Sequence, residues 1–315
     1  MKIKDIGGEF ALIKRIAEKA KDKTILKGIG DDAAVLKLGK KQYVITTDTL
    51  AEGDHFSLKW FSPEQIGKKA MEINVSDIGA MGAIPKYALV SLVLPKKIEV
   101  EFIDKLYQGM RSVCKKYSFE IIGGNITHGK QLVIDIDMIG VVKDLCLRSS
   151  ARPGDFILVS GDLGASRAGL NLFLNKKADK RKFPNVINSH LEPRARFHKV
   201  KPFLRYINSM IDVSDGLASE ITRICEQSNC GAVVYKDNLP IKDETREAAK
   251  IIKKDAVDYA LFGGEDFELV FTVSEKNLSK VKGFLVGEIR KKKGVYLYSK
   301  GKESLVKKKG YDHFT

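Results

Sequence analysis

Apolar and polar positions along the chain follow helical and strand spacing in turn, and this pattern predicts a mixed α/β protein. Apolar residues recur at helical spacing after Glu9, which predicts a first amphipathic helix over residues 9–21. Ser62-Pro63-Glu64-Gln65 is a capping box with proline at the first helical position, so a second helix should begin there and end near Met81. A third helix is predicted at 100–117, and strands at 33–38, 43–47, 88–94, 120–122 and 132–142.

The second half repeats this alternation after a turn signal, Arg152-Pro153-Gly154-Asp155. A glycine-rich loop at 160–164 should open one helix, and residues 215–228 should form another. Strands are predicted at 156–159, 210–213, 231–235, 268–273 and 284–289. We therefore expect two α/β domains, residues 1–147 and residues 148–315, which agrees with a length of 315 residues at about 150 per domain.

The composition is that of a globular protein, with 43% hydrophobic and 30% charged residues. The longest nearly uncharged apolar stretch, residues 87–94, is far shorter than the ~20 residues that span a bilayer. The first residues contain no apolar run of the signal-peptide type, so we expect a cytoplasmic protein without a membrane partner. The four cysteines lack metal-type spacing and are expected to be reduced and mostly buried: Cys114, Cys146, Cys225 and Cys230.

The charge balance is strongly basic, because 55 Lys and Arg face 40 Asp and Glu, a net +15. Much of the excess lies in lysine-rich segments at 176–182, 291–293 and 307–309. The first two segments lack the interleaved aromatic side chains of a stacking platform for single-stranded nucleic acid. We interpret them as a solvated basic surface and expect no nucleic-acid partner. A basic, non-enzymatic nucleic-acid-binding protein is the alternative from a different functional class.

The acidic residues carry more information, because nine of them fall in short segments with Gly or Thr. They are Asp31, Asp32, Asp48, Asp54, Asp77, Asp212, Asp215, Glu265 and Asp266. Oxygen ligands near strand ends suit Mg²⁺. Thr46-Thr47-Asp48-Thr49 is either such a site or a capped turn, and residues 211–216 are either a metal and phosphate site or an ordinary helix cap. Together, the acids predict a nucleotide and several Mg²⁺ ions in a cleft between two domains.

Two segments resemble familiar phosphate-binding loops but lack their context. Gly28–Ala33 fits G-x-G-x-x-A, yet a strand should follow it, and two carboxylates there would repel a pyrophosphate. Gly124–Gln131 fits G-x-x-x-x-G-K, but Gln131 stands where a P-loop needs a hydroxyl and a strand follows. Neither segment is interpreted as a dinucleotide or Walker A loop.

The order of these segments resembles the thiamine-monophosphate kinase family of the PurM-like superfamily. The resemblance covers nearly the whole chain. It implies an N-terminal α/β domain that binds ATP and dimerises through its sheet, followed by a C-terminal α/β domain. The motifs are GIGDDAAVL at 28–36, TTDTLAEGDHF at 46–56, NVSDIGAMGA at 74–83, RSSARPGD at 148–155, IDVSDGL at 211–217, FGGEDFEL at 262–269 and GYDHF at 310–314.

The resemblance also implies an activity, the ATP-dependent phosphorylation of thiamine monophosphate to thiamine diphosphate, in a homodimer. It implies Mg²⁺ ligands at Asp32, Thr46, Thr47, Asp48, Asp77, Asp212 and Asp215, ATP contacts at Tyr107, Gly124, Asn125, Arg148 and Ser214, and thiamine-phosphate contacts at His55, Glu265 and Tyr311. Many members carry Asp where this chain has Asn125, and Asn125 is kept as a metal ligand here. A neutral amide oxygen can coordinate Mg²⁺ but adds no charge.

The implied reaction needs no general base, because a phosphate monoester has a second pKa of about 6 and is already anionic at neutral pH. Asp48, Asp77 and Asp215 are therefore expected to assist an in-line transfer through bound metal. Other PurM-like enzymes are the nearest alternatives. Selenophosphate synthetase would need an N-terminal cysteine, whereas the first here is Cys114, and aminoimidazole ribonucleotide synthetase lacks the GYDHF ending.

Overall fold

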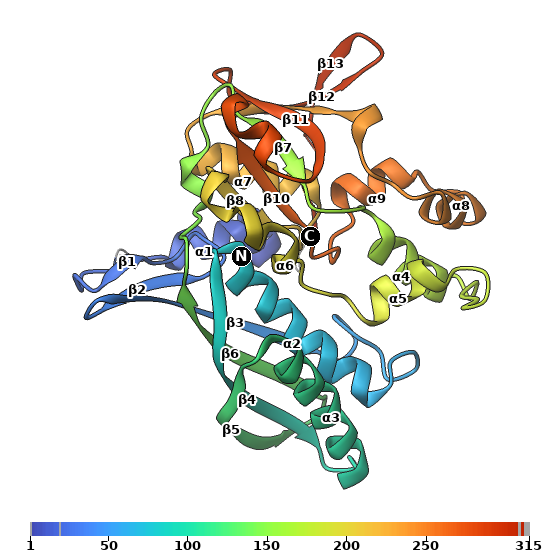
Figure 1. Cartoon of the computed structure of the whole chain (residues 1–315). Coiled ribbons are helices and arrows are strands. Elements are labelled where there is room, and N and C mark those ends of the chain that lie inside the picture. The colour runs from blue at the N-terminus through green and yellow to red at the C-terminus, as the bar shows by residue number, and fades with distance from the viewer. Residues whose placement is uncertain (1, 19, 308–309, 312–315) are drawn as a thin grey trace.

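The computed structural model describes residues 2–18, 20–307 and 310–311, which form two α/β domains, each built on one sheet (Figure 1). Lys308, Lys309 and residues 312–314, which belong to segments named above, lie outside the described residues. The last strand of the first sheet ends at Val142 and the first strand of the second sheet begins at Phe156. The predicted two-domain α/β architecture is confirmed, while a boundary at residue 147 stays a prediction.

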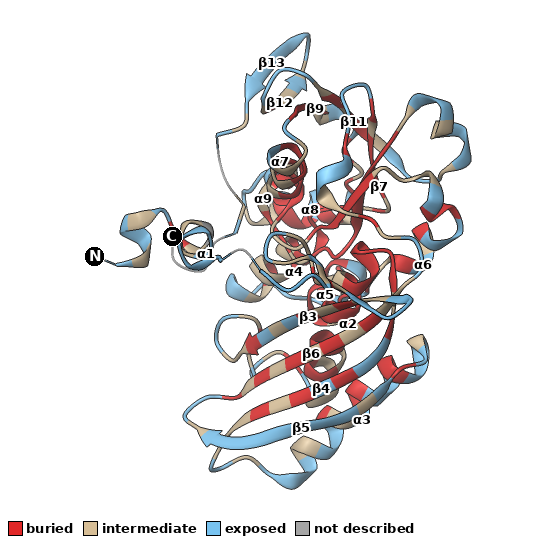
Figure 2. Ribbon diagram, turned by 90° about the vertical axis from the view of Figure 1, so that its left-hand side faces the viewer, coloured by how far each residue is buried: buried red, intermediate tan, exposed pale blue. Residues whose placement is uncertain are grey.

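The first domain is a six-stranded sheet in the order β1-β2-β3-β6-β4-β5, with only β4 and β5 parallel. Two long helices cover one of its faces, and β5 is exposed along nearly its whole length (Figure 2). The elements are η1 (Ile3–Ile6), α1 (Glu9–Ile16), β1 (Ile25–Lys27), β2 (Ala34–Leu38), β3 (Lys41–Ala51), α2 (Pro63–Ala80), β4 (Ala83–Pro95), α3 (Val100–Tyr117), β5 (Glu120–Gly129), β6 (Val133–Val142) and η2 (Arg148–Ser150).

The second domain has a seven-stranded sheet in the order β13-β12-β9-β11-β7-β10-β8, antiparallel except between β12 and β9. Helix α7 packs across β8, β9 and β12. The elements are β7 (Phe156–Val159), α4 (Ala165–Leu174), α5 (Pro184–Leu191), α6 (Phe197–Val200), η3 (Lys201–Tyr206), β8 (Ser209–Asp212), α7 (Leu217–Gln227), β9 (Gly231–Tyr235), η4 (Lys236–Asn238), α8 (Asp243–Ile251), α9 (Ala256–Phe262), β10 (Leu269–Val273), η5 (Glu275–Lys280), β11 (Phe284–Arg290), β12 (Gly294–Ser299) and β13 (Lys302–Leu305).

Helix α2 connects the two domains. Its predicted capping box is present, because the Ser62 hydroxyl accepts from the Gln65 amide and the Gln65 side chain accepts from the Ser62 amide. The helix is buried on almost every side, which is typical of a helix enclosed by other elements rather than lying on a surface. It packs against β3, β4 and β6 of its own domain, against α3, and against β8 of the second domain.

Several predicted elements end elsewhere in the structure. Helix α1 stops at Ile16 rather than near residue 21, because Ala17 is extended and residues 17–21 offer no large apolar side chain to pack. Strand β5 continues past its double glycine to Gly129, because its backbone stays paired with β4. The Thr46–Thr49 segment lies inside β3 rather than at its end, since pairing with β6 extends to Ala51.

The four cysteines are free and buried, as expected. Among the described residues, no helix combines the length and apolarity needed to cross a membrane.

Helices α2 and α3 approach each other closely at Gly67, and this contact yields a stability prediction. A Cβ atom at Gly67 would lie 2.0 Å from the backbone oxygen of Leu106. In an exposed helix, Gly→Ala raises stability by about 1 kcal/mol. Here we expect Gly67→Ala to lower the free energy of unfolding by about 2–3 kcal/mol through overpacking. Denaturant unfolding checks this, with Gly123→Ala as the control, because its Cβ would meet only the end of the Leu89 side chain at 3.2 Å. A Gly67→Ala protein as stable as wild type would contradict the packing.

Candidate active site

Carboxylates from both domains meet where α2 contacts β8. Asp32 precedes β2, Asp77 lies on α2 and Asp212 ends β8, and each offers an oxygen within 4.8 Å of the others. Asp48 on β3 is a neighbour of this group, because it shares a side-chain hydrogen bond with Asp77. The structure therefore brings together acids that are up to 180 positions apart in the sequence (212 minus 32).

Hydroxyl groups hold the central carboxylates in place. The Thr46 hydroxyl donates to Asp77 Oδ2 at 2.6 Å, within the first domain. The Ser76 hydroxyl donates to Asp212 Oδ2 at 2.6 Å, across the two domains. A hydroxyl of β3 thus positions a carboxylate of α2, and a hydroxyl of α2 positions a carboxylate of the second domain.

Three cations neutralise the outer carboxylates of the cluster. Arg148, in η2, forms an ion pair with Asp32, and its backbone amide donates to Asp31 at 3.3 Å. Arg223, on α7, forms an ion pair with Asp215. Lys27 lies 3.4 Å from Asp31. Arg148 was predicted as a site residue from the sequence, whereas Arg223 and Lys27 were not. The signal for Arg223 was its place on the helix that follows Asp215.

The pKa values of the inner carboxylates are all raised above the usual range of an aspartate. Burial, and then repulsion by neighbouring acids, raises the pKa of Asp48 to about 7 although Asp77 hydrogen-bonds to it. Burial and the charge of Asp48 raise the pKa of Asp77 well above its usual range. Burial and the charge of Asp32 do the same for Asp212. A group of buried carboxylates with this much repulsion is suited to a hard cation with oxygen ligands.

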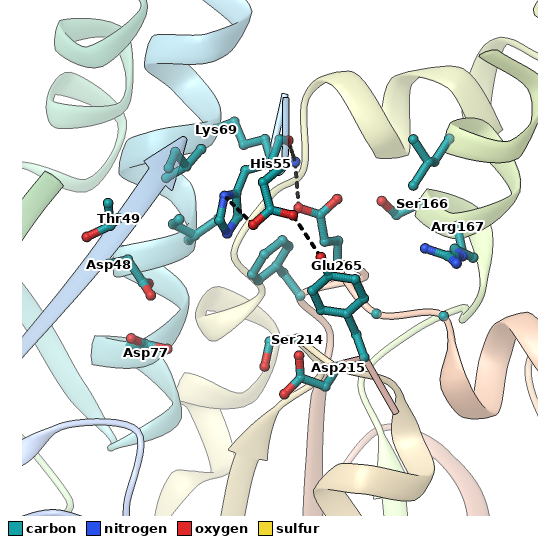
Figure 3. Close-up of a pocket in the computed structure, with 18 of the residues that line it drawn as sticks. Asp48, Thr49, His55, Lys69, Asp77, Ser166, Arg167, Ser214, Asp215 and Glu265 are labelled. Carbon is teal, nitrogen blue, oxygen red and sulfur yellow. Dashed lines mark hydrogen bonds and ion pairs between the residues drawn. The ribbon is translucent and has the colours of Figure 1, made fainter. Parts of the chain in front are cut away.

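Two cavities meet at the carboxylates, and Glu9, Asp48, Asp77 and Ser214 line both. The first cavity has a volume of about 280 Å³ and lies between α2, α4 and the 263–267 segment (Figure 3). The second cavity has about 930 Å³ and lies between α1, the Gly28–Asp32 loop and α7. Besides the shared residues, the second is lined by Asp31, Asp32, Thr46, Thr47, Arg148, Asp212 and Arg223.

A group of polar side chains lies at one end of the first cavity, and some of them were predicted from the sequence. Lys69 Nζ lies 2.6 Å from Glu265 and donates to the His55 carbonyl oxygen at 2.8 Å. The Tyr311 hydroxyl donates to Asp54 at 2.8 Å, so a residue near the end of the chain contacts the β3–α2 loop. His55, Glu265 and Tyr311, which were expected to share one end of the site, all line this cavity. Figure 3 shows His55 and Glu265 near each other.

Charge and tautomer are defined at this end. Burial would raise the pKa of Glu265, but the Lys69 ammonium and a hydrogen bond with His190 together outweigh burial and hold this pKa at about 2, so Glu265 is ionised at neutral pH. The backbone amide of Ala51 donates to His55 Nδ1 at 3.2 Å. The proton of the neutral imidazole therefore resides on Nε2.

Lys69 was missed in the sequence analysis although a signal was present. It lies three residues after Ile66 on the buried stripe of α2, and a lysine there is unusual unless it is paired. Asp266, by contrast, is not a cavity residue of this site. Its buried carboxylate accepts from the Gly164 amide at 2.6 Å and the Ser166 amide at 3.3 Å, which caps α4.

Three residues that were expected to contact ATP lie away from the carboxylates in the structure. Gly124 and Asn125 are on β5, three strands away from β3, a separation of about 14 Å at the usual strand spacing. Tyr107 is on α3, beside Arg111. One copy of the chain therefore does not bring Tyr107, Gly124 or Asn125 to the carboxylates that Arg148 and Ser214 adjoin.

Comparisons with known proteins agree with this architecture. Residues 30–142 match the family model "AIR synthase related protein, N-terminal domain", and residues 152–297 match "AIR synthase related protein, C-terminal domain". A solved structure described as "AaThiL complexed with AMPPCP and TMP" superposes with a TM-score of 0.91 at 36% identity, covering 100% of this chain and 99% of that one. The fold and site thus define a two-domain protein of the AIR synthase related class.

Relatives that match the chain over its full length show to which family of this class it belongs. The chain is 37% identical over 316 residues to the thiamine-monophosphate kinase of Aquifex aeolicus, covering 100% of both chains. It is 36% identical over 327 residues to that of Bacillus subtilis, covering 97% of this chain and 99% of the other. The chain belongs to the thiamine-monophosphate kinase family of enzymes.

The raised carboxylate pKa values predict a link between pH, metal and stability. The folded protein keeps protons on Asp48, Asp77 and Asp212 that the unfolded chain releases near pH 4, so metal-free protein should lose stability as pH rises through about 7. Because Mg²⁺ competes with these protons, it should raise the unfolding temperature more at pH 8 than at pH 6. Thermal unfolding with Mg²⁺ or a chelator, at matched ionic strength, tests this. Equal Mg²⁺ shifts at both pH values would contradict it.

Proposed function

We propose that this chain transfers the γ-phosphoryl group of ATP to the phosphate of thiamine monophosphate, giving thiamine diphosphate and ADP. The observation that carries the proposal is the group of carboxylates at the meeting point of two cavities. A reaction between two anionic substrates needs such a place, where cations can stand between them. The related solved structure, with AMPPCP and TMP in its description, supports this choice of substrates.

The donor set at the junction fits Mg²⁺. It consists of oxygens, and the buried Asp32 Oδ2 has no hydrogen-bond partner among the residues that the structure describes. We assign Asp32, Thr46, Thr47, Asp48, Asp77, Asp212 and Asp215 to metal binding. Bound Mg²⁺ would neutralise charge on the triphosphate and on the acceptor phosphate.

The side chains around the cluster then have separate tasks. Arg148 and Ser214 adjoin the carboxylates and would position the nucleotide phosphates. His55, Glu265 and Tyr311 would hold the acceptor. No residue needs to remove a proton from the acceptor, so the proposed step is a direct in-line transfer.

A second copy of the chain would complete the nucleotide site. The face of the first sheet away from α2 is open, and large apolar side chains on β4 and β5 are exposed there: Tyr87, Leu89 and Ile122. Burying this face in a homodimer would remove apolar surface from water. It would also give Tyr107, Gly124 and Asn125 a route to the carboxylates of the other copy. Asn125 would then be a metal ligand supplied across the interface.

Loss of the dimer should therefore lower activity. We expect wild-type protein to sediment as a dimer and Leu89→Asp to sediment as a monomer with weaker ATP binding, because a charge would be buried in the interface. Leu174→Asp is the matched control, since Leu174 is exposed at the end of α4 in the other domain. A monomeric wild-type protein with full activity would contradict the dimer.

Asp48 should be essential for turnover. Asp48→Asn keeps the shape of the side chain but removes its charge, so kcat should fall by at least about 100-fold, the scale of losing one charge-stabilising group from a preorganised site. Chromatography of thiamine diphosphate and ADP measures this, with circular dichroism to verify folding. Asp258→Asn, on the exposed surface of α9, is the control. Near-wild-type turnover of Asp48→Asn would refute its assignment.

A further inference from the structure

Arg167 is a cation of the first cavity that has no role in the proposed phosphoryl transfer. The cavity is lined by two cations, and one of them, Lys69, is paired with Glu265. The guanidinium of Arg167 forms no hydrogen bond or ion pair within the part of the chain that the structure describes. An unpaired, half-buried charge lowers stability. Such a group at a cavity wall is suited to a ligand.

The backbone around Arg167 makes room for it. Arg167 lies in the first turn of α4, and the stem of its side chain runs beside Gly263, where a Cβ atom would come within 2.7 Å of the Arg167 Cβ. Its charge acts on the Tyr311 hydroxyl and on His190, which places it at the polar end of the cavity. Figure 3 shows Arg167 and the metal-site residue Asp48 on opposite sides of the cavity.

The order of chemical groups along the acceptor determines which of them would face Arg167. Thiamine monophosphate has a phosphate at one end, a thiazolium in the middle and an aminopyrimidine at the other end. The phosphate must reach the carboxylate end, where the cations and the nucleotide would lie. The aminopyrimidine is then left for the polar end, where Arg167 and Glu265 face the cavity.

The donors and acceptors at this end match an aminopyrimidine edge. An aminopyrimidine presents an exocyclic amine, which donates, beside ring nitrogens, which accept. Glu265 is ionised and can only accept, and its side chain remains 29% exposed although Lys69 is bound to it. A guanidinium can only donate.

We propose that Arg167 is a specificity-determining residue that donates to a ring nitrogen of the acceptor's aminopyrimidine, while Glu265 accepts from the exocyclic amine. This inference rests on the proposed function and adds to it a residue that selects the acceptor at the end away from the reacting phosphate.

The two halves of the acceptor can be tested separately as competitive inhibitors. One probe is the hydroxymethyl aminopyrimidine, and the other is the phosphate ester of the hydroxyethyl thiazole. Steady-state kinetics of wild-type, Arg167→Ala and Arg167→Lys proteins would give both inhibition constants, with KM for thiamine monophosphate and for ATP. Arg181→Ala is the control, because it removes the same charge from an exposed position of the same domain.

In Arg167→Ala we expect KM for thiamine monophosphate and the inhibition constant of the aminopyrimidine to rise about tenfold or more. KM for ATP and the inhibition constant of the thiazole phosphate should stay within about twofold of wild type, the size of effect usual for surface substitutions. Arg167→Lys should recover part of the loss. Weaker binding of the thiazole phosphate alone would overturn the proposal and make Arg167 a phosphate contact, and unchanged constants would overturn it outright. Wild-type protein without kinase activity would refute the proposed function instead.

Discussion

Repulsion between like charges is the constraint on which this structure depends. At an effective dielectric constant of 20, two carboxylates 4 Å apart repel by about 4 kcal/mol. The junction collects six: Asp31, Asp32, Asp48, Asp77, Asp212 and Asp215. Ion pairs with Lys27, Arg148 and Arg223 relieve the outer three. Thr46 and Ser76 hold Asp77 and Asp212, and the remaining repulsion appears as raised pKa values. The acids stay together because the surrounding elements are rigid enough to hold them. A bound cation would neutralise the negative charge that remains.

Helix α2 provides much of that rigidity. It is enclosed by both domains, and its successive residues Ser76 and Asp77 contact opposite sides of the junction. Two turns earlier, Lys69 extends from the same helix into the first cavity and fixes the charge of Glu265. A change in the packing of α2 would therefore affect the carboxylate cluster and the first cavity together. This explains why a helix so deeply buried carries so many polar residues.

Local patterns in the sequence predicted many of the helices and acidic site residues. The features that they did not predict depend on pairing between residues far apart in the sequence. The cap at Ser62 and the helix 100–117 follow from spacing within a few residues, and the structure confirms both. The acids could be recognised because they lie in short segments of unusual composition. The pairing of Lys69 with Glu265 joins residues from two domains, and no local pattern contains it. Nor does local pattern show that pairing with β4 carries β5 through its double glycine, or that Tyr107 and Asn125 lie far from the carboxylates of their own chain.

The contact between Tyr311 and Asp54 has a consequence for how the protein is made. Glu9 and Tyr311 both line the first cavity, so residues from the beginning and the end of the sequence enclose the same space. The N-terminal part of a chain emerges from the ribosome first, and domains tend to fold as they emerge. The first domain can form its core while the second is being synthesised, but the first cavity stays open until residue 311 arrives. A chain arrested before residue 311 could already contain all the strands of both sheets and would still lack one wall of that cavity.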